Sequence, residues 1–244
     1  MYIPRVFIPQ ALALGSSITV GETKHHHLSR VLRLSAGAQV ILFNGEGGEF
    51  VGHVTATSKH QTLISIEDFD PISREPKLNI TLLMSVLKRD AMISALQRAT
   101  ELGVAVIIPM LTQHLSEKRT QVEKRFAAWQ GVIEHASEQS GRTCLPHLKP
   151  PMPFETALAD VEAAAIDHRL IAHLGSTNPP DAQSKRVGAL ALAIGPEGGF
   201  STDEVALAET RNFVPYSVGP RTLRAETASA ALLSHLYTAF GEYR

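Results

Sequence analysis

The hydrophobic pattern of this chain changes near residue 77, and that change sets the fold class. Beyond it, apolar runs of strand length alternate with segments of helical periodicity, in which Met92, Leu96 and Ala99 share one face. The apolar runs are residues 78–87, 104–108, 169–174, 190–194 and 213–218. Helices are predicted at residues 90–102, 122–141, 201–210 and 226–240. Apolar strands that alternate with helices predict an α/β fold built on a parallel sheet.

The first 70 residues predict a different architecture. Short runs rich in β-branched and apolar residues occur at 6–8, 38–43, 50–57 and 62–66. The glycine-rich segment 44–48 supplies the positive φ angles of a hairpin turn, and one helix is expected at 22–34. This pattern is typical of a small β-barrel. Residues 70–76 hold two prolines, so we place the boundary there and predict one domain at 1–72 and a second at 73–244.

Composition excludes several classes of protein. Hydrophobic residues make up 44% of the 244 residues, which suits a packed core and not a disordered chain. No apolar run reaches the ~18 residues that span a bilayer, and the N-terminus lacks the pattern of a secretory signal. We therefore expect no membrane partner. The single cysteine, Cys144, rules out an intramolecular disulfide and favours a reducing, cytoplasmic location.

Charge is balanced overall but not along the chain. The net charge of −1 does not by itself indicate nucleic-acid binding. The first 34 residues, however, carry four cations against one acid, a local charge of +3, from Arg5, Lys24, Arg30, Arg33 and Glu22. Residues 35–72 are acidic. A basic N-terminal face suits a polyanion, although charged faces are more often only solvated.

The strongest candidate for a ligand site is the segment Ile-Gly-Pro-Glu-Gly-Gly-Phe-Ser at residues 194–201. It follows a predicted buried strand and precedes a predicted helix that starts with a capping box between Ser201 and Glu204. In open α/β sheets, ligands bind beyond the carboxyl ends of the strands, and glycines there let the backbone approach them closely. The alternative is that this segment is only a tight connection between strand and helix, without a ligand. Such a connection, however, needs fewer glycine and proline residues than this segment has.

Two further segments follow predicted strands in the same way. Residues 217–228 contain Arg221 and Arg224, which are suited to bind phosphate or to stabilise a developing oxyanion. Glu226 follows in the first turn of the next helix. The alternative role for it there is a favourable interaction with the helix dipole and nothing more. The third segment, residues 172–176, also contains glycine. Three successive strand-end loops predict one shared pocket.

Metal and common nucleotide signatures are absent from the sequence. There is no P-loop, no dinucleotide-binding glycine motif and no zinc-protease motif. The run His25, His26 and His27 does not form a metal site on a helix, because consecutive side chains point about 100° apart. We therefore expect no metal.

Seven stretches together point to one known family. They are residues 4–7, 26–33, 43–47, 88–103, 138–142, 194–201 and 221–228. With them the chain resembles the SPOUT superfamily of methyltransferases, and within it the 16S ribosomal RNA uridine-N3 methyltransferases. The resemblance covers essentially the whole chain, and the combination of stretches makes it specific. One small departure is Thr222, where a larger aliphatic residue is usual.

The resemblance implies a fold and an assembly. It implies an N-terminal PUA-like β-barrel for RNA and a C-terminal α/β domain with a mostly parallel sheet and a deep trefoil knot, which composition and periodicity do not reveal. It also implies a homodimer with an active site near the interface between C-terminal domains. We expect the apolar side of the last helix at that contact, with Ala228, Ala231, Leu232, His235 and Phe240.

The resemblance also implies a cofactor, S-adenosylmethionine, which leaves as S-adenosylhomocysteine, and a substrate, 16S ribosomal RNA or the assembled small ribosomal subunit. Its cofactor contacts fall on the three loops, at His173, Leu174, Gly175, Ile194, Gly195, Glu197, Gly198, Val218, Gly219, Leu223 and Arg224. Methylation of uracil N3 requires removal of its proton. We expect Arg224 to stabilise the resulting charge and Glu226 or Glu197 to accept the proton.

For RNA, we expect backbone contacts from Arg5, Arg30 and Arg33. Two other functions stay open at this point. The chain could be a catalytically inactive RNA-binding protein of the same fold, although an inert pocket need not keep all three loops. It could also be a small-molecule α/β enzyme unrelated to RNA, which the basic N-terminal barrel disfavours.

Overall fold

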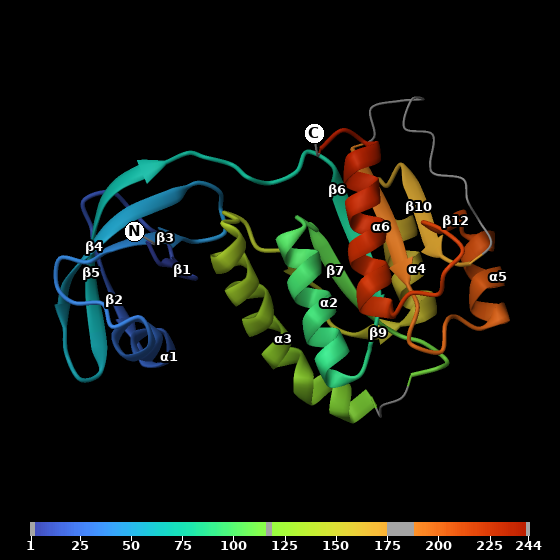
Figure 1. The fold of residues 1–244 in the computed structure, drawn as a ribbon, viewed down its shortest axis with the longest axis horizontal. Helices are drawn as coiled ribbons and strands as arrows, with labels where there is room; N and C mark the ends of the chain where they lie inside the picture. The colour runs from blue at the N-terminus through green and yellow to red at the C-terminus, as the bar shows by residue number, and fades with distance from the viewer. Residues whose placement is uncertain (1–2, 116–118, 175–187, 243–244) are drawn as a thin grey trace. The chain divides into compact units, whose positions relative to one another are not determined.

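The computed structural model describes residues 3–115, 119–174 and 188–242. Its chain divides into two compact units (Figure 1). The first, which we call unit 1, holds residues 1–75 and 137–145, and the second, unit 2, holds residues 76–136 and 146–244. Within the described parts, no helix combines the length and apolar character needed to cross a membrane.

Unit 1 is a curled five-stranded sheet with a short helical segment. The sheet order is β1-β3-β4-β5-β2, with β1 and β3 parallel and the other pairs antiparallel. The strands are β1 (Arg5–Phe7), β2 (Ser17–Gly21), β3 (Gln39–Phe43), β4 (Glu49–Thr57) and β5 (Gln61–Asp70). Inward-facing residues of all five strands form its core with Leu28. Four of these strands match the sequence prediction, and β2 is an addition.

The predicted helix at 22–34 is shorter than expected and irregular. Helix α1 (Glu22–His26) passes directly into a π-helical turn, η1 (His27–Val31). Arg33 then adopts a positive φ of 52°, which ends the helical path. Leu28 is fully buried against the sheet and anchors this segment.

An ion-pair cluster connects the strands of unit 1 with its distant segment 137–145. Glu49 accepts hydrogen bonds from Arg5 and, at 3.0 Å, from Arg74. Arg142 donates to Glu75 at 2.6 Å. Burial alone raises the pKa of Glu49, but the hydrogen bonds from Arg74 and Arg5 outweigh it and hold the pKa below its ordinary value of 4.5.

Replacing Glu49 by Gln should lower the free energy of unfolding by about 1–3 kcal/mol at neutral pH, because both arginines lose a charged acceptor. The depressed pKa makes this stabilisation present above about pH 4.5 and lost as the pH falls below that value. In urea unfolding, the difference between the wild type and Glu49→Gln should therefore shrink in acid. A difference that stays constant with pH would contradict the role of this carboxylate.

Unit 2 confirms the predicted α/β fold class. Its sheet runs in the order β12-β10-β11-β6-β7-β8, with β9 also on β7, and every described pair is parallel. The strands are β6 (Asn79–Ser85), β7 (Val106–Leu111), β8 (His147–Leu148), β9 (Met152–Pro153), β10 (His168–Ala172), β11 (Ala189–Ile194) and β12 (Phe213–Tyr216). The implied knot stays a prediction, because strand pairing does not describe how the chain is threaded.

Helices cover both faces of this sheet (Figure 1). They are α2 (Arg89–Glu101), α3 (Arg119–Ser140), α4 (Phe154–Glu162), α5 (Thr202–Thr210) and α6 (Ala225–Ala239). Helices α2 and α6 pack against each other. Helices α4 and α5 share a separate core with Leu83, Ala191 and Ala193 of the sheet. Helix α4 was not expected from the sequence, and the other four match their predictions.

The expected subunit contact on α6 stays a prediction, and one of its residues is buried within the chain. Leu232, predicted at a subunit contact, is only 3% exposed in a single chain, because it packs inside its own unit. Of its predicted neighbours at that contact, His235 is exposed, whereas Ala228, Ala231 and Phe240 are half-buried. Leu232 therefore belongs to the core of its own unit, whereas the other four residues keep some exposed surface.

Candidate functional site

A pocket of about 680 Å³ lies in unit 2 at the carboxyl ends of β10, β11 and β12. These three strands are neighbours in the sheet, in the order β12-β10-β11. The loops that follow them therefore meet at one edge, as the strand-end positions predict. The loop after β6, the first turn of α2 and the first half of α6 complete the walls through Lys88, Ala91, Glu226, Ala228 and Leu232.

Most of the candidate site residues line this pocket. They are His173 and Leu174 after β10, Ile194, Gly195 and Glu197 after β11, and Val218, Gly219, Leu223, Arg224 and Glu226 after β12. Gly198 belongs to the same turn but does not line the pocket. Gly175 lies outside the described residues. The structure thus brings together all three loops that the sequence singled out.

The glycine-rich turn after β11 is held by the loops that follow β6 and β7. The backbone N–H of Lys88 donates to Glu197 Oε1 at 3.2 Å, and His114 Nδ1 lies 3.0 Å from the carbonyl oxygen of Gly199, to which it donates. At the end of the turn, Ser201 and Glu204 form the predicted capping box. The turn is therefore fixed before any ligand arrives.

At two positions of this turn, the structure explains why the residue is glycine. Gly199 has a φ of +74°, in the left-handed region that side chains disfavour. A Cβ on Gly195 would lie 3.2 Å from both the ring and the backbone nitrogen of Phe200, which itself lines the pocket. A side chain at residue 195 would therefore push on the pocket wall.

Unpaired charges gather around the pocket. Lys88, Arg221 and Arg224 line it, and all three residues are exposed. Among the described residues, none of these three side chains has an ion-pair partner. Arg224 is the N-cap residue of α6 but makes no side-chain capping hydrogen bond, so its guanidinium stays available. The acidic side chains on the walls are Glu197 and Glu226.

Several wall residues were not found by the sequence reasoning. They are Lys88, Ala91, Ala172, Pro196, Gly199, Phe200, Tyr216, Ser217, Thr222, Ala225, Ala228 and Leu232, although some lie in segments that were singled out. Lys88 had an available signal, because it follows β6 closely and strand ends are where ligands bind. No signal in the sequence marked Tyr216 as a wall residue, because its place in the wall depends on the order of the strands in the sheet.

Tyr216 is a buried wall residue with a fixed protonation state. Its hydroxyl shares a hydrogen bond with His235 Nδ1, and the two rings stack with centroids 6.0 Å apart. Burial raises the pKa of Tyr216 to about 12. The hydroxyl therefore stays protonated at neutral pH and does not act as a base.

The three arginines expected to contact RNA fall into two groups within unit 1. Arg5 is held in the ion pair with Glu49 and donates to the carbonyl oxygen of Arg142 at 3.0 Å, and its side chain is only 12% exposed. Arg30 lies on η1 and Arg33 directly after it, and both are exposed. The geometry favours Arg30 and Arg33 as RNA contacts and gives Arg5 a structural role.

Comparison with known proteins agrees with this fold. A family model described as an RNA methyltransferase domain matches residues 74–237, and one described as an RNA methyltransferase PUA domain matches residues 24–67. The ribosomal RNA small subunit methyltransferase E of Synechocystis sp. is 30% identical, over 95% of this chain and 76% of that protein. The protein of the same name from Buchnera aphidicola is 28% identical, over 99% of this chain and 96% of its own.

Solved structures agree as well. A ribosomal RNA small subunit methyltransferase E from Neisseria gonorrhoeae, bound to S-adenosyl methionine, has a TM-score of 0.92 at 30% identity, with 100% of both chains covered. A Legionella pneumophila protein with the same cofactor bound has a TM-score of 0.90 at 32% identity, with 98% of both chains covered.

Fold, pocket and matches together define the class as an RNA methyltransferase with an N-terminal PUA domain. Within that class, the chain belongs to the family of the ribosomal RNA small subunit methyltransferases E. The family resemblance seen in the sequence is therefore confirmed.

Proposed function

We propose that this protein transfers a methyl group from S-adenosylmethionine to N3 of a uridine in the 16S RNA of the small ribosomal subunit. The observation that carries the proposal is the pocket of unit 2. In a chain of this family, it gathers nearly all the residues singled out for the cofactor and for the chemistry. Relatives with this fold have been solved with the cofactor bound.

The pocket fits a cofactor of this kind. Its volume of about 680 Å³ lies within the range of small-molecule sites, which are mostly apolar with a few placed polar groups. Leu174 and Val218 are 47% and 38% exposed, and both line the pocket, so a bound ligand would cover apolar surface that now faces water. Backbone groups of Gly195 and Gly219 would contact the cofactor directly.

The bound cofactor supplies an activated methyl group on a sulfonium, which requires no metal, and leaves as S-adenosylhomocysteine. The protein's own task is to make uracil N3 nucleophilic. Arg224 would donate charge-assisted hydrogen bonds to the oxygens over which the negative charge of the deprotonated ring spreads. Its free guanidinium on the pocket wall supports this role.

For the proton, the two candidate carboxylates differ in their surroundings. Glu197 already accepts a hydrogen bond from the backbone of Lys88 and so helps to hold the glycine-rich turn. Glu226 lines the pocket from the first turn of α6, two residues after Arg224. We therefore favour Glu226 as the acceptor of the N3 proton and assign Glu197 to the positioning of the turn.

We further propose that the domain at residues 1–72 binds the RNA, with Arg30 and Arg33 on the backbone, and that the domain at 73–244 binds the cofactor and forms a homodimer. Free 16S RNA and the assembled small subunit are both candidate substrates. A reducing, cytoplasmic location agrees with the single cysteine.

The proposal is tested with purified protein, labelled cofactor and two substrates, naked 16S RNA and small ribosomal subunits. We expect calorimetric binding of S-adenosylmethionine, and mass spectrometry of digested RNA should find N3-methyluridine at one position. Cofactor binding without a methylated nucleoside in either substrate would indicate an inactive RNA-binding relative. Methylation at another atom or of a small molecule only would overturn the substrate assignment.

A further inference from the structure

Most arginine and lysine side chains of unit 1 form ion pairs within the unit. They belong to ion pairs with acidic residues that come from other segments of the same unit. The pairs are Arg5 and Arg74 with Glu49, Arg142 with Glu75, and Lys24 with Glu138. Paired charges of this kind cost desolvation to separate, so they are poor candidates for contacts with an outside polyanion.

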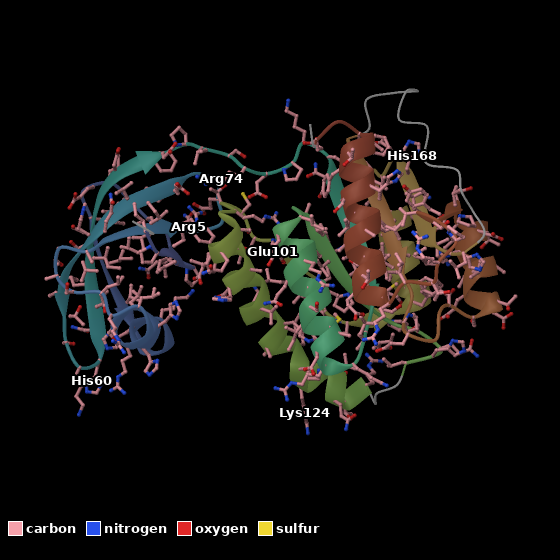
Figure 2. All side chains as sticks on the ribbon, viewed as in Figure 1. Arg5, His60, Arg74, Glu101, Lys124 and His168 are labelled. Atoms are coloured by element: carbon pink, nitrogen blue, oxygen red, sulfur yellow. The ribbon has the colours of Figure 1, made fainter. Side chains whose placement is uncertain are left out.

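The remaining cations of unit 1 are Arg30, Arg33 and Lys59. All three are exposed, and among the described residues none has an ion-pair partner. Arg30 and Arg33 come from η1 and its end, whereas Lys59 lies at the tip of the β4–β5 hairpin beside the exposed His60, which Figure 2 labels.

Buried His25 joins the hairpin tip to the helical segment. His25 is 7% exposed. Its Nε2 donates to the carbonyl oxygen of Lys59 at 3.2 Å, and its Nδ1 shares a 2.9 Å hydrogen bond with the Thr62 hydroxyl. The strand register agrees, since Gly21, just before α1, pairs with Gln61 at the start of β5. The free cations of unit 1 therefore lie on one side of it.

Acidic residues gather at the opposite end of the same hairpin. Asp68 and Asp70 lie at the far end of β5, where Asp70 pairs with Glu49, and Glu46 lies in the turn before β4. At about 3.3 Å per residue, the nine steps of β5 from Gln61 to Asp70 extend over roughly 30 Å, so the acidic end of the hairpin lies far from Lys59. That distance exceeds the Debye length of about 8 Å at physiological salt, so the charges at the two ends of the hairpin are largely screened from each other.

The basic end lacks the apolar centre that a protein partner would need. In the described residues, the exposed large apolar side chains are Ile3, Leu14, Phe69, Leu174, Val214 and Val218, and none of them belongs to the helical segment or the hairpin tip. Free cations without apolar surface suit a phosphate backbone, where contacts are electrostatic.

We propose that one RNA-binding surface, the hairpin–turn surface, is formed by His26, Arg30, Arg33, Lys59 and His60. In it, Lys59 contacts the RNA backbone, a role that its position in the sequence, far from Arg30 and Arg33, does not suggest. The proposal rests on RNA being the substrate and adds where the N-terminal domain holds it. Lys59 contacts phosphate as a point charge, and the exposed imidazoles of His26 and His60 add hydrogen-bond donors beside it. Arg5 is not part of this surface.

The test compares Lys59→Ala, Lys59→Glu and the matched control Lys124→Ala, which removes one exposed lysine from α3 outside the surface. Affinity for 16S RNA is measured over a range of salt concentrations. Lys59→Ala should lower the slope of log affinity against log salt by about 0.7–0.9 and weaken binding about threefold to tenfold at low salt. Lys59→Glu should weaken it further, and Lys124→Ala should match the wild type.

Cofactor binding by calorimetry and the KM for RNA in methylation are measured on the same samples. In Lys59→Ala, cofactor affinity should stay near wild type because the cofactor pocket lies in unit 2, whereas the KM for RNA should rise as RNA affinity falls. If the wild type methylates 16S RNA but Lys59→Glu keeps its affinity and salt slope, the hairpin–turn surface is only solvated and this inference fails alone. If the wild type neither binds nor methylates RNA at any salt concentration, the proposed function fails with it.

Discussion

Replacing Arg224 by alanine is expected to slow methyl transfer by about 10²–10³-fold while leaving most of the cofactor affinity intact. The guanidinium lines the pocket without an ion-pair partner among the described residues, so its charge is available to the substrate. The negative charge on uracil develops only as the N3 proton leaves. Loss of the donor should therefore raise the barrier more than it weakens binding.

The structural consequences of this substitution should be small. Arg224 is exposed and makes no side-chain hydrogen bond at the start of α6, so truncation leaves the helix cap unchanged. In steady-state methylation, kcat and kcat/KM for RNA should fall by similar factors, the sign of an interaction made in the transition state.

Two further variants separate charge from geometry. Arg224→Lys keeps the charge but loses the planar fork, and should fall between the wild type and the alanine variant. Arg119→Ala removes an arginine of α3 that is not part of the pocket wall, and should react at the wild-type rate. Near-normal turnover in Arg224→Ala would remove this arginine from the mechanism.

Gly195→Val is expected to weaken cofactor binding by at least about 100-fold without unfolding the protein. Even the first added carbon would lie 3.2 Å from the ring and from the backbone nitrogen of Phe200. Because β11 before it is buried from Leu190 to Ile194, the turn and Phe200 must move instead. Both form the pocket wall, and overpacking of this kind costs about 1–3 kcal/mol of stability.

The matched control is Gly188→Val, at the other end of β11. Gly188 is exposed, and a Cβ there would come no closer than 3.9 Å to Asp167, so this variant should bind the cofactor like the wild type. Gly195→Ala should be intermediate. Calorimetry measures affinity, and thermal unfolding verifies that each variant is folded. A folded Gly195→Val protein with wild-type cofactor affinity would refute the role of this turn.

The loops of the site could be predicted because local chemistry determines them. A buried strand, a turn rich in glycine and a capping box at Ser201 are all encoded within a few neighbouring residues, and the structure has each of them. Their convergence also followed from a general rule, since parallel strands end at one edge of a sheet. The two-part organisation appeared in the change of hydrophobic period near residue 77.

Positions in the wall that depend on strand order could not be predicted in this way. Tyr216 lies beside β10 rather than β11 because β12 forms the edge of the sheet, and Lys88 reaches the pocket because β6 pairs with β11. Pairing between distant strands results from the packing of whole faces, which no short stretch of sequence encodes.

The chain by itself determined the α/β class, the glycine-rich turn, the two arginines of the next loop and the family, because these rest on local pattern. Tertiary structure alone decided which charges are free. Arg5 and Arg30 look equivalent in the sequence, yet Arg5 meets Glu49, 44 residues away, while Arg30 stays exposed and unpaired among the described residues. The physical reason is that an ion pair forms between side chains that folding brings together, and sequence distance carries no information about that meeting.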